Sequence, residues 1–165
     1  MNDYAVYVLI ALSACYAVET VADALNLRAL SPRPPAALAH LFDAERYARS
    51  QDYVRAKTRF ALVSRTFDLV LLLVFWLAGG FGWLDGFVRG FGRGPIVTGL
   101  CYVGALLLAR TLIGLPFSWF HTFVVEERFG FNRTDTRTFW ADRAKAMALG
   151  VVLGAPLLAV ILFFL

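Results

Sequence analysis

Four long apolar runs constrain what this chain can fold into. They cover about residues 4–27, 60–83, 96–125 and 146–165. A helix needs about 20 consecutive, mostly apolar residues to cross a hydrocarbon core roughly 30 Å thick. The runs show no period-2 alternation of apolar and polar residues, so each favours a helix over a strand. The sequence therefore predicts an all-α, multi-pass transmembrane domain with four spanning helices and no sheet beyond a short extended piece near 124–131.

The composition agrees with a lipid environment. Hydrophobic residues make up 59% of the 165 residues and charged residues 17%, whereas a soluble domain has about 25% charged residues. The first run follows Met1-Asn2-Asp3, which has no basic residue, and it is too long for a cleavable signal. No basic stripe alternates with base-stacking aromatic residues, so we expect membrane lipid as a partner and no nucleic acid.

The basic residues predict how the chain is oriented. The connector 28–59 contains seven Lys and Arg, the connector 126–145 contains five, and the connector 84–95 contains two. Cytoplasmic connectors of membrane proteins carry an excess of Lys and Arg. We therefore expect connectors 28–59 and 126–145 to be cytoplasmic and the amino terminus to lie outside.

Three segments between or within the runs give further expectations. Residues 43–60 are predicted to form an amphipathic cytoplasmic helix, with Tyr53, Lys57 and Phe60 on one face at i, i+4 and i+7. The glycine-rich connector 84–95 is predicted to be a flexible turn. Pro116 is expected to kink or end the third span, because proline removes a backbone donor from a helix.

The stretch 115–145 joins the most polar chemistry to apolar chain. Glu126 and Glu127 precede an aromatic-glycine-aromatic-asparagine turn, after which Thr134 or Asp135 can cap a new helix. Adjacent side chains diverge on a regular element, so an acid–base role for the two glutamates is disfavoured, and we interpret them as structural hydrogen-bond acceptors. The spacing of Asp142 and Lys145, i and i+3, predicts an ion pair.

The sequence offers no evident metal site. His40 and His121 are its only histidines, and neither has a second ligand at metal spacing. We expect His121 to be an interfacial, solvated residue. Cys15 and Cys101 each lie inside an apolar run, and we interpret them as small buried hydrophobic residues.

Three charges on three runs fall at one predicted depth. At about 1.5 Å per residue and a core about 30 Å thick, Glu19, Arg110 and Asp68 lie roughly 22, 21 and 18 Å below the outer boundary. The hypothesis is that Arg110 faces inward and pairs with Asp68 or Glu19, lining the cytoplasmic part of an internal cavity. Two alternatives remain open: Arg110 snorkels to the near interface, and Glu19 with Asp23 simply faces the interface.

The chain resembles the CAAX prenyl protease 1 family across nearly its whole length, most specifically over 114–145. The resemblance rests on Tyr53, Lys57, Phe60, Gly114, Leu115, Pro116, Phe117, Ser118, Glu126, Glu127, Arg128, Phe129, Gly130, Phe131, Asn132, Thr134, Phe139, Asp142 and Lys145. It implies a membrane zinc metalloendopeptidase whose helices enclose a chamber for a peptide or prenylated peptide.

The family's zinc motif, His-Glu-x-x-His, does not occur in this sequence. The resemblance therefore covers the amino-terminal membrane domain, residues 1–165, and implies that zinc and its ligands belong to the catalytic carboxy-terminal half. This chain alone is expected to bind no cofactor and to be inactive. The fourth run ends at Leu165 without a polar flank, so we expect truncation there. The alternative is a stand-alone four-span protein that binds lipids or partner helices without catalysis.

Overall fold

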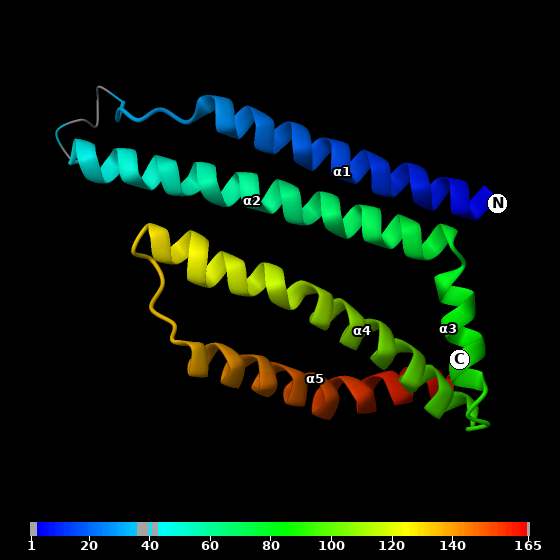
Figure 1. The fold of residues 1–165 in the computed structure, drawn as a ribbon. Helices are drawn as coiled ribbons and strands as arrows, with labels where there is room; N and C mark the ends of the chain where they lie inside the picture. The colour runs from blue at the N-terminus through cyan, green and yellow to red at the C-terminus, as the bar shows by residue number, and fades with distance from the viewer. Residues whose placement is uncertain (1–2, 36–39, 41–42, 165) are drawn as a thin grey trace. The chain divides into compact units, whose positions relative to one another are not determined.

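The structure is a computed structural model that describes residues 3–35, 40 and 43–164. It is built of helices, which Figure 1 shows in chain order. They are α1 (Asp3–Ala29), α2 (Ala44–Leu77), α3 (Gly80–Arg89), α4 (Pro95–Phe120), the π-helix η2 (His121–Glu126) and α5 (Thr136–Phe164). The described ranges contain no strand. Parts of two predicted segments, 36–39 and 41–42 in the first connector and residue 165 in the fourth span, lie outside the described residues.

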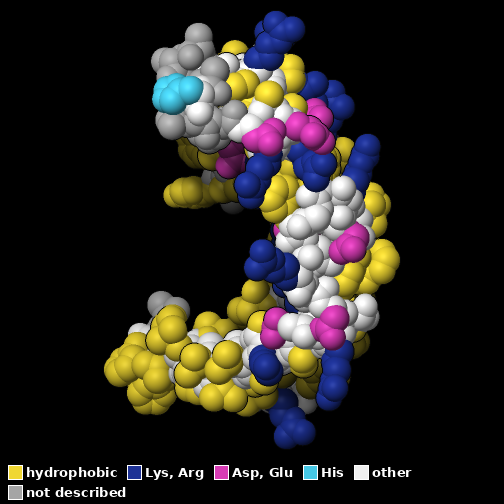
Figure 2. Space-filling model, turned by 90° about the vertical axis from the view of Figure 1, so that its left-hand side faces the viewer, with side chains coloured by type: hydrophobic (Ala, Val, Ile, Leu, Met, Phe, Trp, Pro, Cys, Tyr) yellow, Lys and Arg dark blue, Asp and Glu magenta, His cyan; other side chains and the backbone are white. Residues whose placement is uncertain are grey.

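The prediction of an all-α chain with four spanning helices is confirmed. Four helical segments are long and apolar enough to cross a membrane: Asp3–Ala29, Ala44–Leu77, Pro95–Glu126 and Thr136–Phe164. Their large apolar side chains are widely exposed, for example Leu153 and Phe163, and Figure 2 shows broad hydrophobic areas on the visible surface. Soluble monomeric proteins rarely expose apolar surface of this extent to water. We therefore expect lipid and neighbouring helices to cover it.

The chain divides into two compact units. The first comprises Met1–Leu72 with Phe123–Gly130, and the second comprises Leu73–Thr122 with Phe131–Leu165. In the first unit, α1 and the part of α2 up to Leu72 lie side by side and antiparallel (Figure 1). In the second unit, α4 packs against both α3 and α5.

The second predicted span and the predicted amphipathic helix form one element. Helix α2 runs without a break for 34 residues from Ala44 to Leu77, about 51 Å at the usual helical rise. It ends six residues before the predicted boundary at 83, because Gly79 adopts a positive φ of 76°. A left-handed residue stops a helix, and glycine takes that conformation without a steric penalty.

The prediction of a flexible glycine-rich turn at 84–95 is wrong for its first part. Helix α3 begins at Gly80 and continues to Arg89. Glycine in a helix costs about 1 kcal/mol relative to alanine, and side-chain pairs one turn apart offset a small part of this cost. Trp83 stacks on Phe87 at 5.7 Å between ring centroids, and Asp85 pairs with Arg89 at 2.7 Å.

Pro116 does not end the third span. It lies inside α4, which continues to Phe120 and then widens into η2 up to Glu126. A proline removes one backbone hydrogen bond, and spanning helices tolerate this loss because local adjustments and neighbouring groups satisfy the freed carbonyl. The short extended piece expected near 124–131 is also absent from the described chain, since η2 and a tight turn occupy this stretch.

Candidate functional site

The turn after η2 is closed by backbone hydrogen bonds and requires a glycine. The Phe129 N–H donates to the Glu126 carbonyl at 3.3 Å, and the Gly130 N–H donates to the Glu127 carbonyl at 3.0 Å. Gly130 has a φ of 75°, a conformation that costs other L-residues roughly 1–2 kcal/mol. The two glutamates thus contribute their carbonyls to a helix end.

This turn packs against α2 through an aromatic pair. Within the first unit, the rings of Tyr53 and Phe129 meet edge to face with centroids 5.6 Å apart. The Lys57 ammonium lies 5.9 Å from the Tyr53 centroid, and the Arg128 guanidinium lies 5.8 Å from the Phe129 centroid. Two motif stretches far apart in sequence therefore form one cluster, in which cations flank an aromatic pair.

The chain after the turn, in the second unit, caps the start of α5. The Asn132 side-chain oxygen accepts a hydrogen bond from the Thr134 N–H at 2.8 Å, and an Asp135 carboxylate oxygen accepts one from the Thr138 N–H at 2.8 Å. Asp135 rather than Thr134 is therefore the cap. Hydrogen bonds from the Thr138 side chain and then its backbone N–H lower the pKa of Asp135.

The first turns of α5 hold the remaining motif residues. Phe139 is buried, at 5% exposure, and the Arg143 guanidinium lies 5.1 Å from its ring centroid. Asp142 and Lys145 form the expected i, i+3 pair with 4.0 Å between the carboxylate oxygen and Nζ, but both side chains are mostly exposed. A pair of this kind contributes little to stability, so Phe139 is the main packing residue here.

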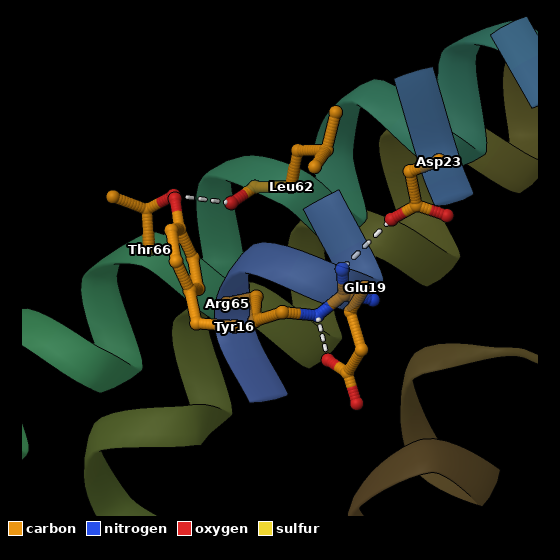
Figure 3. A network of polar contacts seen from close by, with 6 residues as sticks. All are labelled: Tyr16, Glu19, Asp23, Leu62, Arg65 and Thr66. Carbon is orange, nitrogen blue, oxygen red and sulfur yellow. Dashed lines mark hydrogen bonds and ion pairs between the residues drawn. The ribbon is translucent and has the colours of Figure 1, made fainter. Parts of the chain in front are cut away.

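A second polar cluster joins α1 to α2 inside their apolar stretches (Figure 3). Arg65 Nε lies 2.9 Å from Glu19 Oε2, and Arg65 Nη1 lies 2.8 Å from Asp23 Oδ2. Tyr16 lies one turn of α1 before Glu19, and its hydroxyl lies 2.7 Å from Thr66 Oγ1. We call these five residues the α1–α2 polar cluster.

The backbone and small side chains complete the α1–α2 contact. Thr66 Oγ1 donates to the Leu62 carbonyl at 2.8 Å, so the hydroxyl that meets Tyr16 is fixed in orientation (Figure 3). Thr20 and Ser64 lie beside the cluster with buried hydroxyls that have no hydrogen-bond partner in the described chain.

The cluster shows a residue that the sequence argument missed. Glu19 and Asp23 both pair with Arg65. The pairing of Arg65 with these two acids could have been predicted from the sequence. A charge inside an apolar run needs a counter-charge, and Glu19 and Asp23 lie one turn apart on another run. Arg110 lies on α4 in the second unit, and its pairing with Asp68 or Glu19 stays a prediction.

The interpretation of the two cysteines as buried residues is wrong. Cys15 and Cys101 are both free thiols and both exposed. An apolar residue in a soluble protein is placed in the core, but a spanning helix can direct it to lipid instead. His121, expected to be solvated, begins η2 and is half-buried.

A zinc ion does not fit the donor set of the residues that the structure describes. Among the described residues, no group of three or more His, Cys, Asp or Glu side chains is placed to hold a metal. Structural and catalytic zinc sites take three or four such ligands.

The helices and the turn together define a multi-pass membrane domain. Residues 23–165 match the family model described as CAAX prenyl protease N-terminal, five membrane helices. The chain therefore belongs to the CAAX prenyl protease family and contains its amino-terminal membrane domain. The family description counts five membrane helices. The described residues contain four long apolar candidates, and the first, Asp3–Ala29, lies mostly before the matched region.

Several relatives agree with this assignment. The chain is 31% identical to the probable CAAX prenyl protease 1 of Schizosaccharomyces pombe over 75% of its own length and 29% of the relative's. It is 31% identical to the CAAX prenyl protease 1 homolog of Arabidopsis thaliana over 90% of its length and 37% of the relative's. The crystal structure of S. mikatae Ste24p matches 90% of this chain and 36% of its own, with a TM-score of 0.83 and 28% identity.

The chain thus spans about a third of the length of these relatives. The motif stretch 114–145, where the resemblance is most specific, lies entirely inside the matched region.

Proposed function

We propose that this chain is the membrane-embedded amino-terminal part of a zinc metalloendopeptidase, and that it forms part of an intramembrane chamber that admits a peptide or prenylated peptide for cleavage. The observation that carries this proposal is the Tyr53–Phe129 contact, which joins the two motif stretches into one structural unit. The family match over residues 23–165 supports it.

The relatives are longer than this chain, and the proposal assigns catalysis to the part of the protein that corresponds to their remaining length. A peptidase of this type needs zinc ligands and a carboxylate base, and the donor set of the described residues does not supply them. The catalytic carboxy-terminal half of the same protein would supply both. In this proposal Glu126 and Glu127 have a structural role, and their backbone carbonyls already accept hydrogen bonds at the end of η2.

In this proposal the residues of the chain shape and hold the chamber wall. The α1–α2 polar cluster fixes the register of two wall helices, because its ion pairs and hydroxyl contact form only at one relative position. The cluster around Tyr53 and Phe129 anchors the turn that follows the third span. Arg110, paired with Asp68 or Glu19, would present a polar surface to the cytoplasmic part of the cavity.

The first test reads the gene beyond the codon for Leu165. A His-Glu-x-x-His motif further along the same reading frame supports the proposal. A stop codon directly after Leu165 contradicts it and favours a stand-alone four-span protein that binds lipids or partner helices.

The second test measures activity of the product of the whole reading frame, purified in detergent. We expect cleavage of a prenylated peptide that stops when zinc is removed by a chelator and returns when zinc is restored. The matched control carries Gln in place of the motif Glu and should be inactive although it retains zinc. Cleavage that is insensitive to chelation would contradict a metallopeptidase.

A further inference from the structure

Helix α3 is too short to cross a membrane, yet it connects two helices that do. Its 10 residues give a length of about 15 Å, half of the hydrocarbon thickness. Only Ala78 and Gly79 separate it from the end of α2, and the Trp83 N–H donates to the Gly79 carbonyl at 2.9 Å. This close link holds the start of α3 at the depth where α2 leaves the membrane.

One side of this segment is an exposed aromatic ladder, which we define as Trp83, Phe87 and Phe91. The residues lie at i, i+4 and i+8 and contact one another in sequence. Trp83 stacks on Phe87 with 5.7 Å between centroids, and Phe87 meets Phe91 edge to face at 5.2 Å. They are 68%, 56% and 58% exposed, so the described chain leaves most of the ladder uncovered.

The other two sides of α3 are a packed side against α4 and a charged side. Val88 is buried, at 3% exposure, and α3 packs against α4. Asp85 and Arg89, each two residues from a ladder position and therefore on the opposite side, form an ion pair at 2.7 Å. Helix α3 thus has a packed side, a charged side and an unpartnered aromatic side.

The helices on either side of α3 also expose apolar side chains at the ends nearest to it. Leu77 at the end of α2 and Val97 at the start of α4 are 66% and 45% exposed, and both belong to candidate membrane spans. Because α3 connects these two spans, lipid that covers their exposed ends is also within reach of the ladder.

We propose that α3 lies in the plane of the membrane surface with the aromatic ladder inserted at the boundary between lipid headgroups and acyl chains. Its partner is the lipid bilayer itself. Trp and other aromatic residues concentrate at this boundary, and short amphipathic helices bury an apolar face there while their charged face meets water. Asp85, Arg89 and Arg93 then lie on the aqueous side. This inference rests on the four spans and not on the proposed proteolytic function.

The test places this chain in liposomes that carry bromine, a quencher of Trp fluorescence, at defined depths. A variant keeps Trp83 alone of the four Trp residues, through Trp76→Phe, Trp119→Phe and Trp140→Phe. We expect bromines near the carbonyl end of the acyl chain to quench Trp83 several-fold more than bromines near the methyl end. Aqueous iodide should quench it weakly.

Two reference variants calibrate depth in the same liposomes. A Trp placed at Leu108, an exposed position in the middle of α4, should be quenched most by the deep bromines. A Trp placed at Arg49, an exposed position near the start of α2, should be quenched mainly by iodide. In both variants Trp83 is also replaced by Phe.

Three outcomes would overturn the proposal. Quenching of Trp83 by iodide but by no brominated lipid would place the ladder in water. Quenching that matches the Leu108 reference would place α3 in the hydrocarbon. Protection from both quenchers would show that a second copy or another protein covers the ladder.

The variant in which three Trp residues are replaced could misfold, so a second measurement tests the proposal without these substitutions. A nitroxide is attached to Phe87→Cys in a chain with Cys15→Ala and Cys101→Ala, which keeps all four Trp residues. The proposal expects the nitroxide to be several-fold more accessible to oxygen, which concentrates in lipid, than to a water-soluble nickel chelate. The reverse preference would contradict it.

Discussion

At the scale of single residues, Arg65 is a charge inside an apolar stretch that pairs with two acids. Its side chain is 31% exposed and holds two carboxylates, Glu19 and Asp23, at 2.9 and 2.8 Å. A charge inside an apolar span costs about 2.5–3.5 kcal/mol even on insertion scales. The three groups are therefore tolerated together but not singly, and removing the only cation among them should be far more harmful than removing a surface charge.

The first prediction compares Arg65→Ala with Arg49→Ala. Loss of Arg65 leaves two carboxylates without their cation between α1 and α2, and we expect stability to fall by about 2 kcal/mol or more. Arg49 pairs with Glu45 on an exposed surface, at 64% and 87% exposure, so its loss should change stability by less than about 0.5 kcal/mol. Unfolding in mixed detergent micelles measures both variants. Equal midpoints would contradict a stabilising role for the cluster.

The second prediction concerns Asp135 and pH. Because its pKa is lowered in the folded chain, the carboxylate stabilises the start of α5 above the ordinary Asp pKa of about 3.9. This stabilisation is lost as the pH falls through the lowered pKa. Hydrogen exchange of the Thr138 amide, corrected for intrinsic rates, should therefore accelerate at acid pH.

Two substitutions separate the cap from its charge. Asp135→Ala should exchange the Thr138 amide faster at neutral pH, because the acceptor is gone. Asp135→Asn should protect that amide at both pH values, since asparagine caps a helix about as well and does not titrate there. A pH response of the Asn variant equal to that of the parent would show that another group titrates.

At the scale of elements, helix ends follow from a few glycines and one close approach. Gly79 and Gly130 end helices through positive φ, whereas Gly99 is placed by packing. A Cβ built on Gly99 would lie 2.6 Å from Leu162 Cδ1 on α5, but one built on Gly104 would have nothing within 4 Å. Packing within the described chain therefore requires a small residue at Gly99 but not at Gly104.

The third prediction compares Gly99→Leu with Gly104→Leu. The larger side chain at Gly99 must displace Leu162, and overpacking of this kind costs about 1–3 kcal/mol. At Gly104 the same change meets open space and should cost less than about 0.5 kcal/mol. Detergent unfolding midpoints report both. Leu162→Ala should restore part of the loss at Gly99, and failure to do so would show that α5 does not limit this position.

At the scale of the whole molecule, apolar length predicted the four helices but not where each begins and ends. The run 60–83 contains the junction between α2 and α3, and the choice of Gly79 as the break depends on a backbone conformation that hydropathy does not report. The predicted depth along the spans grouped Glu19 with Arg110 and Asp68, but the direction in which a side chain points does not follow from its depth. Helix packing decides that, so Arg65 was missed. The Tyr53–Phe129 contact joins residues far apart in sequence, and the family resemblance marked both without indicating that they touch.

The last prediction is the orientation of the chain in the membrane. Connectors 28–59 and 126–145 contain seven and five Lys and Arg, against two in connector 84–95. The positive-inside rule therefore places α3 and the amino terminus outside. Single cysteines report this in a chain with Cys15→Ser and Cys101→Ser, expressed in the inner membrane of bacterial cells. A membrane-impermeant maleimide should label Gly92→Cys in intact cells. It should label Ser31→Cys and Glu127→Cys only after the cells are permeabilised. Labelling of Ser31→Cys in intact cells would mean that another signal outweighs the basic connectors, and the orientation would have to be reversed.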